Sequence, residues 1–333
     1  MSTQAIHTPT SRGFTIVELL IVVVVISILT AITIVAYNGI TNRAKTAALQ
    51  SALNQAVKKI NLYAIENGDN YPATASDAGL FDTADVSYAY EKNNAASPKA
   101  YCITTTSSSM SYFSTSAAKT ASPGTCIGLV GWWPMNGGLS DQSGYNNNGT
   151  LNGTTLASGQ SGATNSAYSF NGTSSDYITV PNFNQSVLNP SSFGASWTLT
   201  IWAKWGGLFT NEGVLIGKQG CNSGIYEYAG KYAFSIKGSG CWTGSQTIYG
   251  STLDTSWHSL VATYQAGAMS FYQDGALQGT ATLANMSGYG DTLGIGSGGY
   301  ASYTFNGLLD DARVYTRGLS ASEISNLHTA GAQ

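Results

Sequence analysis

The longest apolar run stands near the start of the chain, where residues 14–36 read FTIVELLIVVVVISILTAITIVA. Its only charged residue is Glu18. As a helix these 23 residues would extend about 35 Å, enough to cross a bilayer whose hydrocarbon core is about 30 Å thick. A carboxylate at the centre of a bilayer costs about 2.5–3.5 kcal/mol, so we expect Glu18 to have a function.

Behind this run the apolar pattern becomes one-sided. From Leu49 to Tyr63 apolar residues recur every third or fourth position, with lysines between them. This spacing predicts an amphipathic helix that continues the first one to about Asn67, where the sequence Asn-Gly-Asp-Asn-Tyr-Pro ends it. The following Ser/Thr/Ala-rich residues, 71–127, predict a small antiparallel sheet that lies on this helix.

From residue 128 onward, glycines separate short strands rich in aromatic residues. Residues 196–205 alternate as a half-buried strand, and residues 269–277 predict a hairpin whose two-residue turn is Asp274-Gly275. Many short strands with glycine turns indicate a β-sandwich. The sequence therefore predicts a long helix with a small sheet, followed by an all-β jelly-roll sandwich over residues 128–333.

The charge distribution argues against nucleic acid as a partner. The chain has 333 residues, 9% of them charged, and a formal net charge of −3. Residues 129–333 hold six basic against ten acidic residues, whereas nucleic-acid binding needs clustered lysine and arginine.

The four cysteines form two local pairs in the sequence. They allow three disulfide connectivities, of which Cys102 with Cys126 and Cys221 with Cys241 is the simplest in an exported protein. Their spacing matches no zinc or redox motif.

The residues around the start of the apolar run carry a specific signal. Met1–Gly13 is short and polar, unlike a secretory leader, and residues 12–20 read RGFTIVELL. This string resembles the class III signal of type IV prepilins. The resemblance implies cleavage between Gly13 and Phe14 by a prepilin peptidase, N-methylation of Phe14, and pairing of Glu18 with the terminal amine of a neighbouring subunit. The alternative is an unrelated transmembrane helix with a stray glutamate.

The type IV pilin resemblance also implies organisation and location. Residues 1–13 would be the leader and residues 14–127 the pilin module. The subunit would lie in the cytoplasmic membrane before assembly with other pilin subunits, and in an extracellular pilus afterwards.

A second set of motifs covers residues 129–330. In order along the chain, they resemble a laminin G-like, concanavalin A-like lectin/glucanase domain, which implies a jelly roll that binds glycans or glycoproteins and often holds a structural Ca²⁺. The motifs are LVGWWPM (129–135), DQSG (141–144), NNNGT (146–150), YSFNG (168–172), DYI (176–178), WHSL (257–260), YQDG (272–275), FNGLLDDARVY (305–315) and LSASEI (319–324).

A calcium site is the one metal site that the sequence suggests. Ca²⁺ takes six to eight oxygen ligands, and several oxygen-bearing side chains lie close together in the sequence. Asp141 and Asn147 offer oxygens in one loop, and Asp310 or Asp311 could complete the shell if the first and last strands meet. The alternative is an Asx-type turn capped by Asp141 and a solvated pair of carboxylates. No organic cofactor is expected.

Aromatic residues beside short polar ones are candidates for binding a sugar. Tyr226, Tyr228 and Trp242 could stack on a pyranose, although each tyrosine, taken alone, is more often a packing residue in a sandwich of this kind.

Catalysis is not expected. Asp310 and Asp311 are neighbours in a strand and so should point to opposite faces, unlike the carboxylates of a glucanase. Glu323 completes a capping box with Ser320, and His258 reads as a strand residue with a buried hydrogen bond.

Two functions fit these features. The favoured one is a minor, tip-exposed pilus subunit that acts as an adhesin through its laminin G-like module. The alternative is a pseudopilin or a bulky major pilin whose sandwich is a structural or protein-docking spacer. A polysaccharide hydrolase is a more distant third.

Overall fold

The computed structural model describes residues 16–108, 110–181, 183, 196–208, 212–218, 223–236, 245–283, 292–297 and 303–333. The chain divides into two compact units, Met1–Ala48 and Leu49–Gln333, which are considered separately below.

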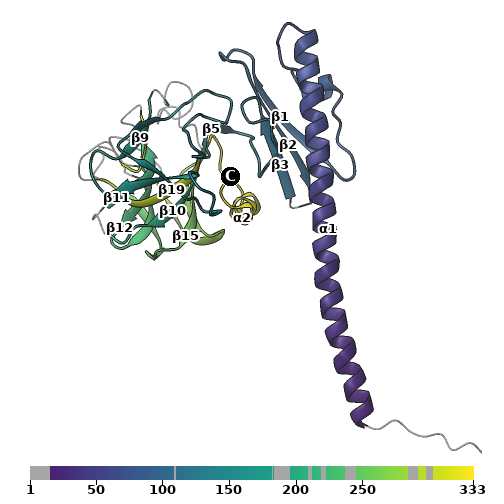
Figure 1. The fold of residues 1–333 in the computed structure, drawn as a ribbon. Helices are drawn as coiled ribbons and strands as arrows, with labels where there is room; N and C mark the ends of the chain where they lie inside the picture. The colour runs from purple at the N-terminus through teal and green to yellow at the C-terminus, as the bar shows by residue number, and fades with distance from the viewer. Residues whose placement is uncertain are drawn as a thin grey trace, which may run out of the picture. The chain divides into compact units, whose positions relative to one another are not determined.

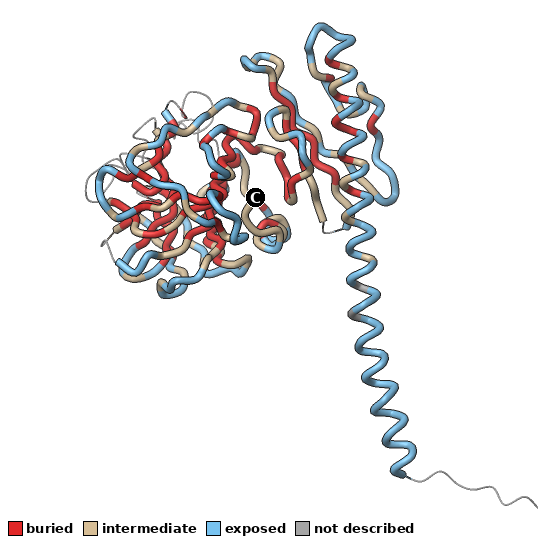
Figure 2. Tube along the Cα trace, viewed as in Figure 1, coloured by how far each residue is buried: buried red, intermediate tan, exposed pale blue. Residues whose placement is uncertain are grey.

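Helix α1 (Ile16–Glu66) is 51 residues long, and by length and composition its apolar part could cross a membrane. Among the described side chains of the unit Met1–Ala48 the apolar ones are exposed, as the pale blue trace of the helix in Figure 2 shows. Ile16, for example, is 85% accessible. The helix ends one residue before the predicted Asn67, because Gly68 and Asp69 adopt positive φ angles of 63° and 60°. The predicted long helix is thus confirmed.

A four-stranded antiparallel sheet packs on the second part of α1, as predicted (Figure 1). Leu53, Ala56 and Ile60 of the helix share a buried cluster with Tyr101 and Ile103 of the sheet. The sheet has the order β1-β2-β3-β4, with bounds β1 (Ser87–Asn93), β2 (Ala100–Ser107), β3 (Met110–Thr115) and β4 (Ser122–Pro123), and a 3₁₀ turn, η1 (Ala75–Ala78), precedes it. The disulfide Cys102–Cys126 is present, which confirms one predicted pair.

The remainder of the chain forms two antiparallel sheets, which Figure 1 shows as two layers. One sheet has the order β17-β16-β15-β10-β19-β8-β7, with β5 also paired to β19. Its strands are β5 (Leu129–Trp133), β7 (Thr155–Ala157), β8 (Ala167–Asn171), β10 (Ser196–Trp205), β15 (Trp257–Gln265), β16 (Ala268–Gln273), β17 (Ala276–Thr282) and β19 (Asn306–Tyr315). We call this sheet the inner sheet, because it faces the pilin module.

The other sheet, called the outer sheet, has the order β14-β13-β12-β11-β18-β9-β6. Its strands are β6 (Thr150–Asn152), β9 (Tyr177–Val180), β11 (Glu212–Lys218), β12 (Ser223–Tyr228), β13 (Lys231–Ile236), β14 (Gln246–Thr252) and β18 (Leu293–Ile295). Together the sheets form the predicted β-sandwich.

Alternate residues of both sheets fill the space between them. Ile201 and Phe271 of the inner sheet share one buried core with Ile225 and Phe234 of the outer sheet. In Figure 2 the strands of the sandwich contain many buried stretches, drawn in red. Burial of this apolar area is the main force that holds the sandwich together.

Two local predictions of the sandwich are confirmed. Asp274 and Gly275 join β16 to β17 with positive φ angles of 53° and 76°, as a two-residue type I′ turn requires. Ser320 and Glu323 form the predicted capping box at the start of helix α2 (Ala321–Ala330).

Candidate functional site

The predicted assembly segment is only partly within the described residues. Gly13 and Phe14 lie outside them, whereas Glu18 lies in the first turn of α1. The apolar side chains that follow Glu18 are exposed in the isolated chain, so they need lipid or the helices of other subunits to cover them.

The predicted calcium ligands do not assemble into an oxygen shell. Oδ1 of Asp141 accepts hydrogen bonds from the backbone N–H groups of Trp132 and Ser143, and Oδ2 accepts from the Ser143 hydroxyl and from Asn147 N–H. Burial raises the pKa of Asp141, and these donors oppose that shift. The geometry is that of the capped Asx-type turn, which leaves the Asp141 oxygens facing donors rather than a cation.

Two of the other three candidate ligands are engaged elsewhere. Asp311 pairs with Arg313, and the side chain of Asn147 donates to the carbonyl of Val130 at 2.7 Å. Among the described residues no three of histidine, cysteine, aspartate and glutamate gather into a group that could hold a metal ion. The residues present therefore do not fit the predicted calcium site.

A β-bulge in β19 overturns the prediction that Asp310 and Asp311 point to opposite faces. Asp311 has a φ of 43°, and two residues of β19, Asp311 and Ala312, stand opposite Ile201 of β10. Leu309 and Ala312 both contribute to the core, so the two acids between them both lie off the core-facing side. The bulge interrupts the alternation on which that prediction depended.

The two acids are nevertheless closed off from solvent. Asp310 is 1% and Asp311 is 3% exposed. Asp310 accepts from Gln160 N–H at 3.0 Å, and burial raises the pKa of Asp310 to about 7. Neither carboxylate reaches a surface where a substrate could meet it.

The predicted sugar-binding aromatics divide into three cases. Tyr226 is 1% exposed and matches the packing alternative, whereas Tyr228, two residues further on β12, is 39% exposed. Trp242 lies outside the described residues, as do Cys221 and Cys241. Tyr249 of β14 was not predicted; it is 43% exposed and stacks with Tyr228 at 6.2 Å between ring centroids and 22° between ring planes.

Alternation along the strands places this tyrosine pair on the outer face of the outer sheet. Ile225 and Ile248 point into the core, so Tyr228 and Tyr249, at odd offsets from them, point away from it. In the sequence, Tyr249 could have been found as the residue that directly follows the core-facing Ile248, because neighbouring strand residues point to opposite faces. Two exposed, nearly parallel rings offer a platform for the apolar face of a sugar.

His258 on β15 makes the predicted hydrogen bond. Its Nδ1 lies 2.7 Å from Oδ2 of Asp274, and its Nε2 lies 3.2 Å from Oδ1 of Asp254. The hydrogen bond to Asp274 raises the pKa of His258, against the opposing effect of burial.

We expect His258 to make the stability of the chain fall as pH rises above 6.5. A group whose pKa is raised by folding contributes stability that is complete below its unfolded pKa, 6.5 here, and is lost as pH rises through the folded value. Urea unfolding of wild type and His258→Gln on both sides of this window measures the effect. The variant should lose more stability on the acidic side, and an equal loss on both sides would contradict the assignment.

The pilin sheet and the sandwich share a buried cluster within the unit Leu49–Gln333. The hydroxyl of Tyr315 on β19 donates a hydrogen bond to the carbonyl of Thr125, so a polar contact also joins the two parts of the cluster. We call this cluster the junction core; its residues are Cys102, Phe113 and Cys126 of the pilin module and Leu129, Trp132, Val261, Tyr315, Leu319, Ile324 and Leu327 of the sandwich. The predicted boundary at residue 128 therefore lies within a continuous core.

A buried ion pair lies beside the junction core. Arg313 donates from Nε and Nη2 to the two carboxylate oxygens of Asp311 at 2.9 and 2.7 Å, and both side chains are at most 3% exposed. The Arg313 guanidinium lies 4.8 Å from the ring centroid of Trp132 and 5.8 Å from that of Phe113. The Trp132 indole also donates to Asp311 at 2.7 Å. The pair thus ties β19 to β5 within the sandwich, and its guanidinium also lies against Phe113 of β3 in the pilin module.

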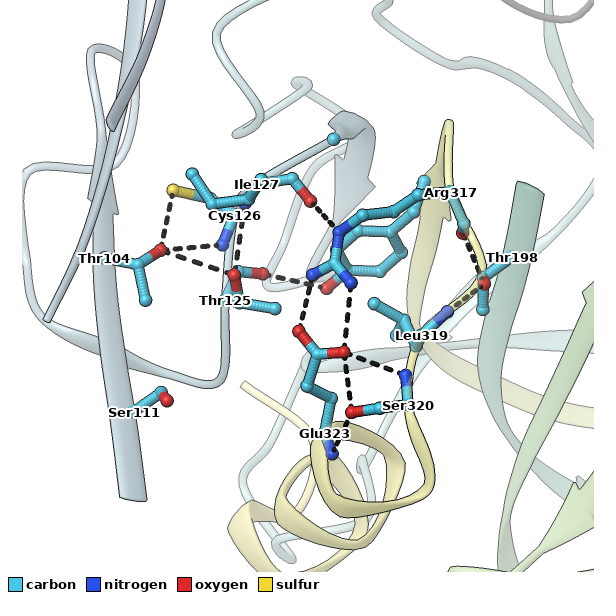
Figure 3. Close-up of polar contacts among 12 residues, drawn as sticks. Thr104, Ser111, Thr125, Cys126, Ile127, Thr198, Arg317, Leu319, Ser320 and Glu323 are labelled. Carbon is cyan, nitrogen blue, oxygen red and sulfur yellow. Dashed lines mark hydrogen bonds and ion pairs between the residues drawn. The ribbon is translucent and has the colours of Figure 1, made fainter. Parts of the chain in front are cut away.

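A second ion pair joins the connecting segment to helix α2 (Figure 3). Arg317 donates to the carbonyl of Ile127 at 2.8 Å and to both oxygens of Glu323, which also caps α2 through Ser320. Thr104 of β2 bonds to Cys126 N–H at 3.2 Å on the other side of the same segment. Both modules therefore fix the segment that connects them.

Family comparisons bear directly on both resemblances. Residues 9–34 match the prokaryotic N-terminal methylation motif, and residues 171–325 match the concanavalin A-like lectin/glucanases superfamily. The chain therefore carries the N-terminal motif of a type IV prepilin. The same chain also carries a laminin G-like, concanavalin A-like domain, so both predicted resemblances are confirmed. No curated protein matches the chain.

Among solved structures, the chain is similar to toxin binding domains. The binding domain of Paraclostridial Mosquitocidal Protein 1 is 18% identical, with a TM-score of 0.49 over 60% of this chain and 52% of that one. The ligand binding domain of botulinum neurotoxin serotype D, in complex with N-acetylneuraminic acid, is 16% identical, with a TM-score of 0.49 over 61% and 50%. The chain spans about half the length of these structures, and similarity this weak carries no inference about function.

Proposed function

We propose that this chain is a minor, tip-exposed type IV pilus subunit whose sandwich binds glycans or glycoproteins. The observation that carries the proposal is the prepilin methylation motif and the concanavalin A-like domain on one chain. The motif implies a pilus subunit, processed by a peptidase and assembled with other subunits. The exposed apolar part of α1 supports membrane insertion before that assembly.

The glycan surface that we propose is the Tyr228–Tyr249 pair. Both rings are exposed and stack on each other at 22° between ring planes, so the apolar C–H face of a sugar can pack on the ring surface that the stack leaves open. We also propose that the chain is not a hydrolase, since the only adjacent pair of acids in the sandwich, Asp310 and Asp311, is buried.

We expect the variant Tyr228→Ala/Tyr249→Ala to bind a glycan about 30-fold more weakly, because the loss of an aromatic anchor costs about 2 kcal/mol. A glycan array probed with the full chain identifies the ligand, and titration measures the loss. Tyr228→Phe/Tyr249→Phe keeps both rings and should bind nearly as wild type. Phe81→Ala removes an aromatic that is 67% exposed on the pilin module, so it serves as the matched control.

A wild-type chain that binds no glycan on the array would overturn the adhesin and favour the spacer. Immunogold labelling along filaments tests the tip placement separately. We expect label at filament ends, and label along the whole length would instead support a bulky major pilin.

A further inference from the structure

A groove of about 640 Å³ opens between two loops of the unit Leu49–Gln333. One wall is formed by residues 117–122, which lead from β3 into β4, and the other by residues 134–142, which follow β5. Trp132 and Gln333 complete the lining. Its volume lies in the range of about 300–1,000 Å³ that is usual for ligand sites.

The lining is polar but almost uncharged. Hydroxyl groups come from Thr120, Ser122 and Ser140, and carboxamide groups come from Asn136, Gln142 and Gln333. Among the described residues that line the groove, Lys119 is the only one with a charged side chain. Hydroxyl and amide groups pair with sugar hydroxyls, while the partly exposed ring of Pro134 can meet a C–H face. A single lysine offers little attraction for a polyanion.

Gln142 is fixed by its backbone and leaves its side chain available. Its N–H donates to the carbonyl of Trp132 at 2.8 Å, and its carbonyl accepts from the Thr115 hydroxyl at 2.6 Å. Within the described residues its half-buried carboxamide has no hydrogen-bond partner. The side-chain atoms of Gln142 are not among the fully buried polar atoms that lack a partner, so solvent reaches this amide and a ligand hydroxyl can take the place of that solvent.

Trp132 is held rigidly at the base of the groove. Its indole N–H is bonded to Asp311, and its ring packs edge-on against Phe113 with centroids 5.2 Å apart. Because Trp132 is only 3% exposed, it forms a fixed wall at the base of the groove and offers little surface for stacking.

The rim of the groove is open at two glycines. A Cβ atom built on Gly137 or Gly138 would meet no atom within 4 Å. Gly137 has a φ of 75°, a conformation that disfavours side chains, whereas Gly138 is not among the glycines of positive φ. Position 138 can therefore accept a large side chain that blocks the groove without backbone strain.

We propose that this groove binds a neutral oligosaccharide. The inference rests on the proposed function for its ligand class but names a separate site. Trp132 belongs to the inner sheet, whereas Tyr228 and Tyr249 lie on the outer face of the outer sheet. The groove also needs both modules, because residues 117–122 belong to the pilin module and residues 134–142 to the sandwich.

The test uses the full chain, purified in a detergent without a sugar headgroup, on an array of neutral and acidic glycans. Gly138→Phe should abolish binding of one set of neutral glycans. Gln142→Ala should weaken the same set about tenfold, the effect of one lost hydrogen bond. Ala276→Phe adds the same ring at an exposed position of β17 and should leave binding unchanged. Melting temperatures check that each variant is folded. If Gly138→Phe does not fold, the effect of Gln142→Ala on glycan binding tests the proposal alone.

Each result separates the groove from the tyrosine pair. If both groove variants keep every glycan while Tyr228→Ala/Tyr249→Ala loses them, the groove proposal is overturned and the proposed function stands. If the groove variants lose glycans that the tyrosine variant keeps, the groove is supported. If the groove variants lose acidic glycans and no neutral ones, the neutral assignment is overturned. An array with no wild-type binding overturns both.

Discussion

Glu18→Ala is expected to leave a membrane-inserted subunit that is at least about tenfold poorer in filament assembly. In a filament core of packed apolar helices the dielectric constant is low, so a carboxylate beside a terminal amine is strongly attracted to it. Breaking such a buried pair by removing one partner costs about 3–5 kcal/mol. Filament yield and membrane content of cells that carry the variant measure the effect.

The matched control for this prediction is Glu66→Ala, at the opposite end of the same helix. Glu66 is exposed and outside the apolar run, so its removal should leave assembly unchanged. Normal incorporation of Glu18→Ala into filaments would count against the pairing. Loss of the Glu18→Ala subunit from the membrane would instead point to a failure of insertion.

Asp311→Ala is expected to destabilise the folded chain by about 3–5 kcal/mol, because it leaves the Arg313 guanidinium buried without a counterion. The same substitution removes the acceptor of the Trp132 indole beside the junction core. Chemical unfolding of the full chain in detergent, followed by tryptophan fluorescence, measures the loss.

Two controls separate the ion pair from other effects. Asp85→Ala removes an exposed acid of the pilin module and should cost less than about 0.5 kcal/mol. Asp311→Leu/Arg313→Met removes both charges and should be less destabilising than Asp311→Ala alone, since a buried pair replaced by apolar groups is often tolerated. If Asp311→Ala were as mild as Asp85→Ala, the pair would not hold the junction.

Local signals in the sequence predicted the elements that depend on local physics. The apolar run and the one-sided pattern after Leu49 gave helix α1, and the Asp274-Gly275 turn and the Ser320/Glu323 capping box lie where they were expected. Each of these depends on a few neighbouring residues, such as a positive φ at a turn or a hydroxyl at a helix start.

Features that depend on tertiary packing could not be predicted in this way. The bulge at Asp311 shifts the alternation of β19 by one residue, and nothing in the adjacent sequence marks it. Tyr226 and Tyr228 lie on the same face of one strand, yet one is buried and the other exposed. The groove is formed by loops that come close only after the two modules pack, so no sequence motif predicts it.

The central claim is that this chain is a processed type IV pilus subunit that carries a glycan-binding sandwich on its pilin module. Mass spectrometry of the mature N-terminus, taken from purified filaments, tests it most directly. The account predicts a chain that begins at N-methylated Phe14. A chain that retains residues 1–13 and stays in the membrane fraction would contradict it.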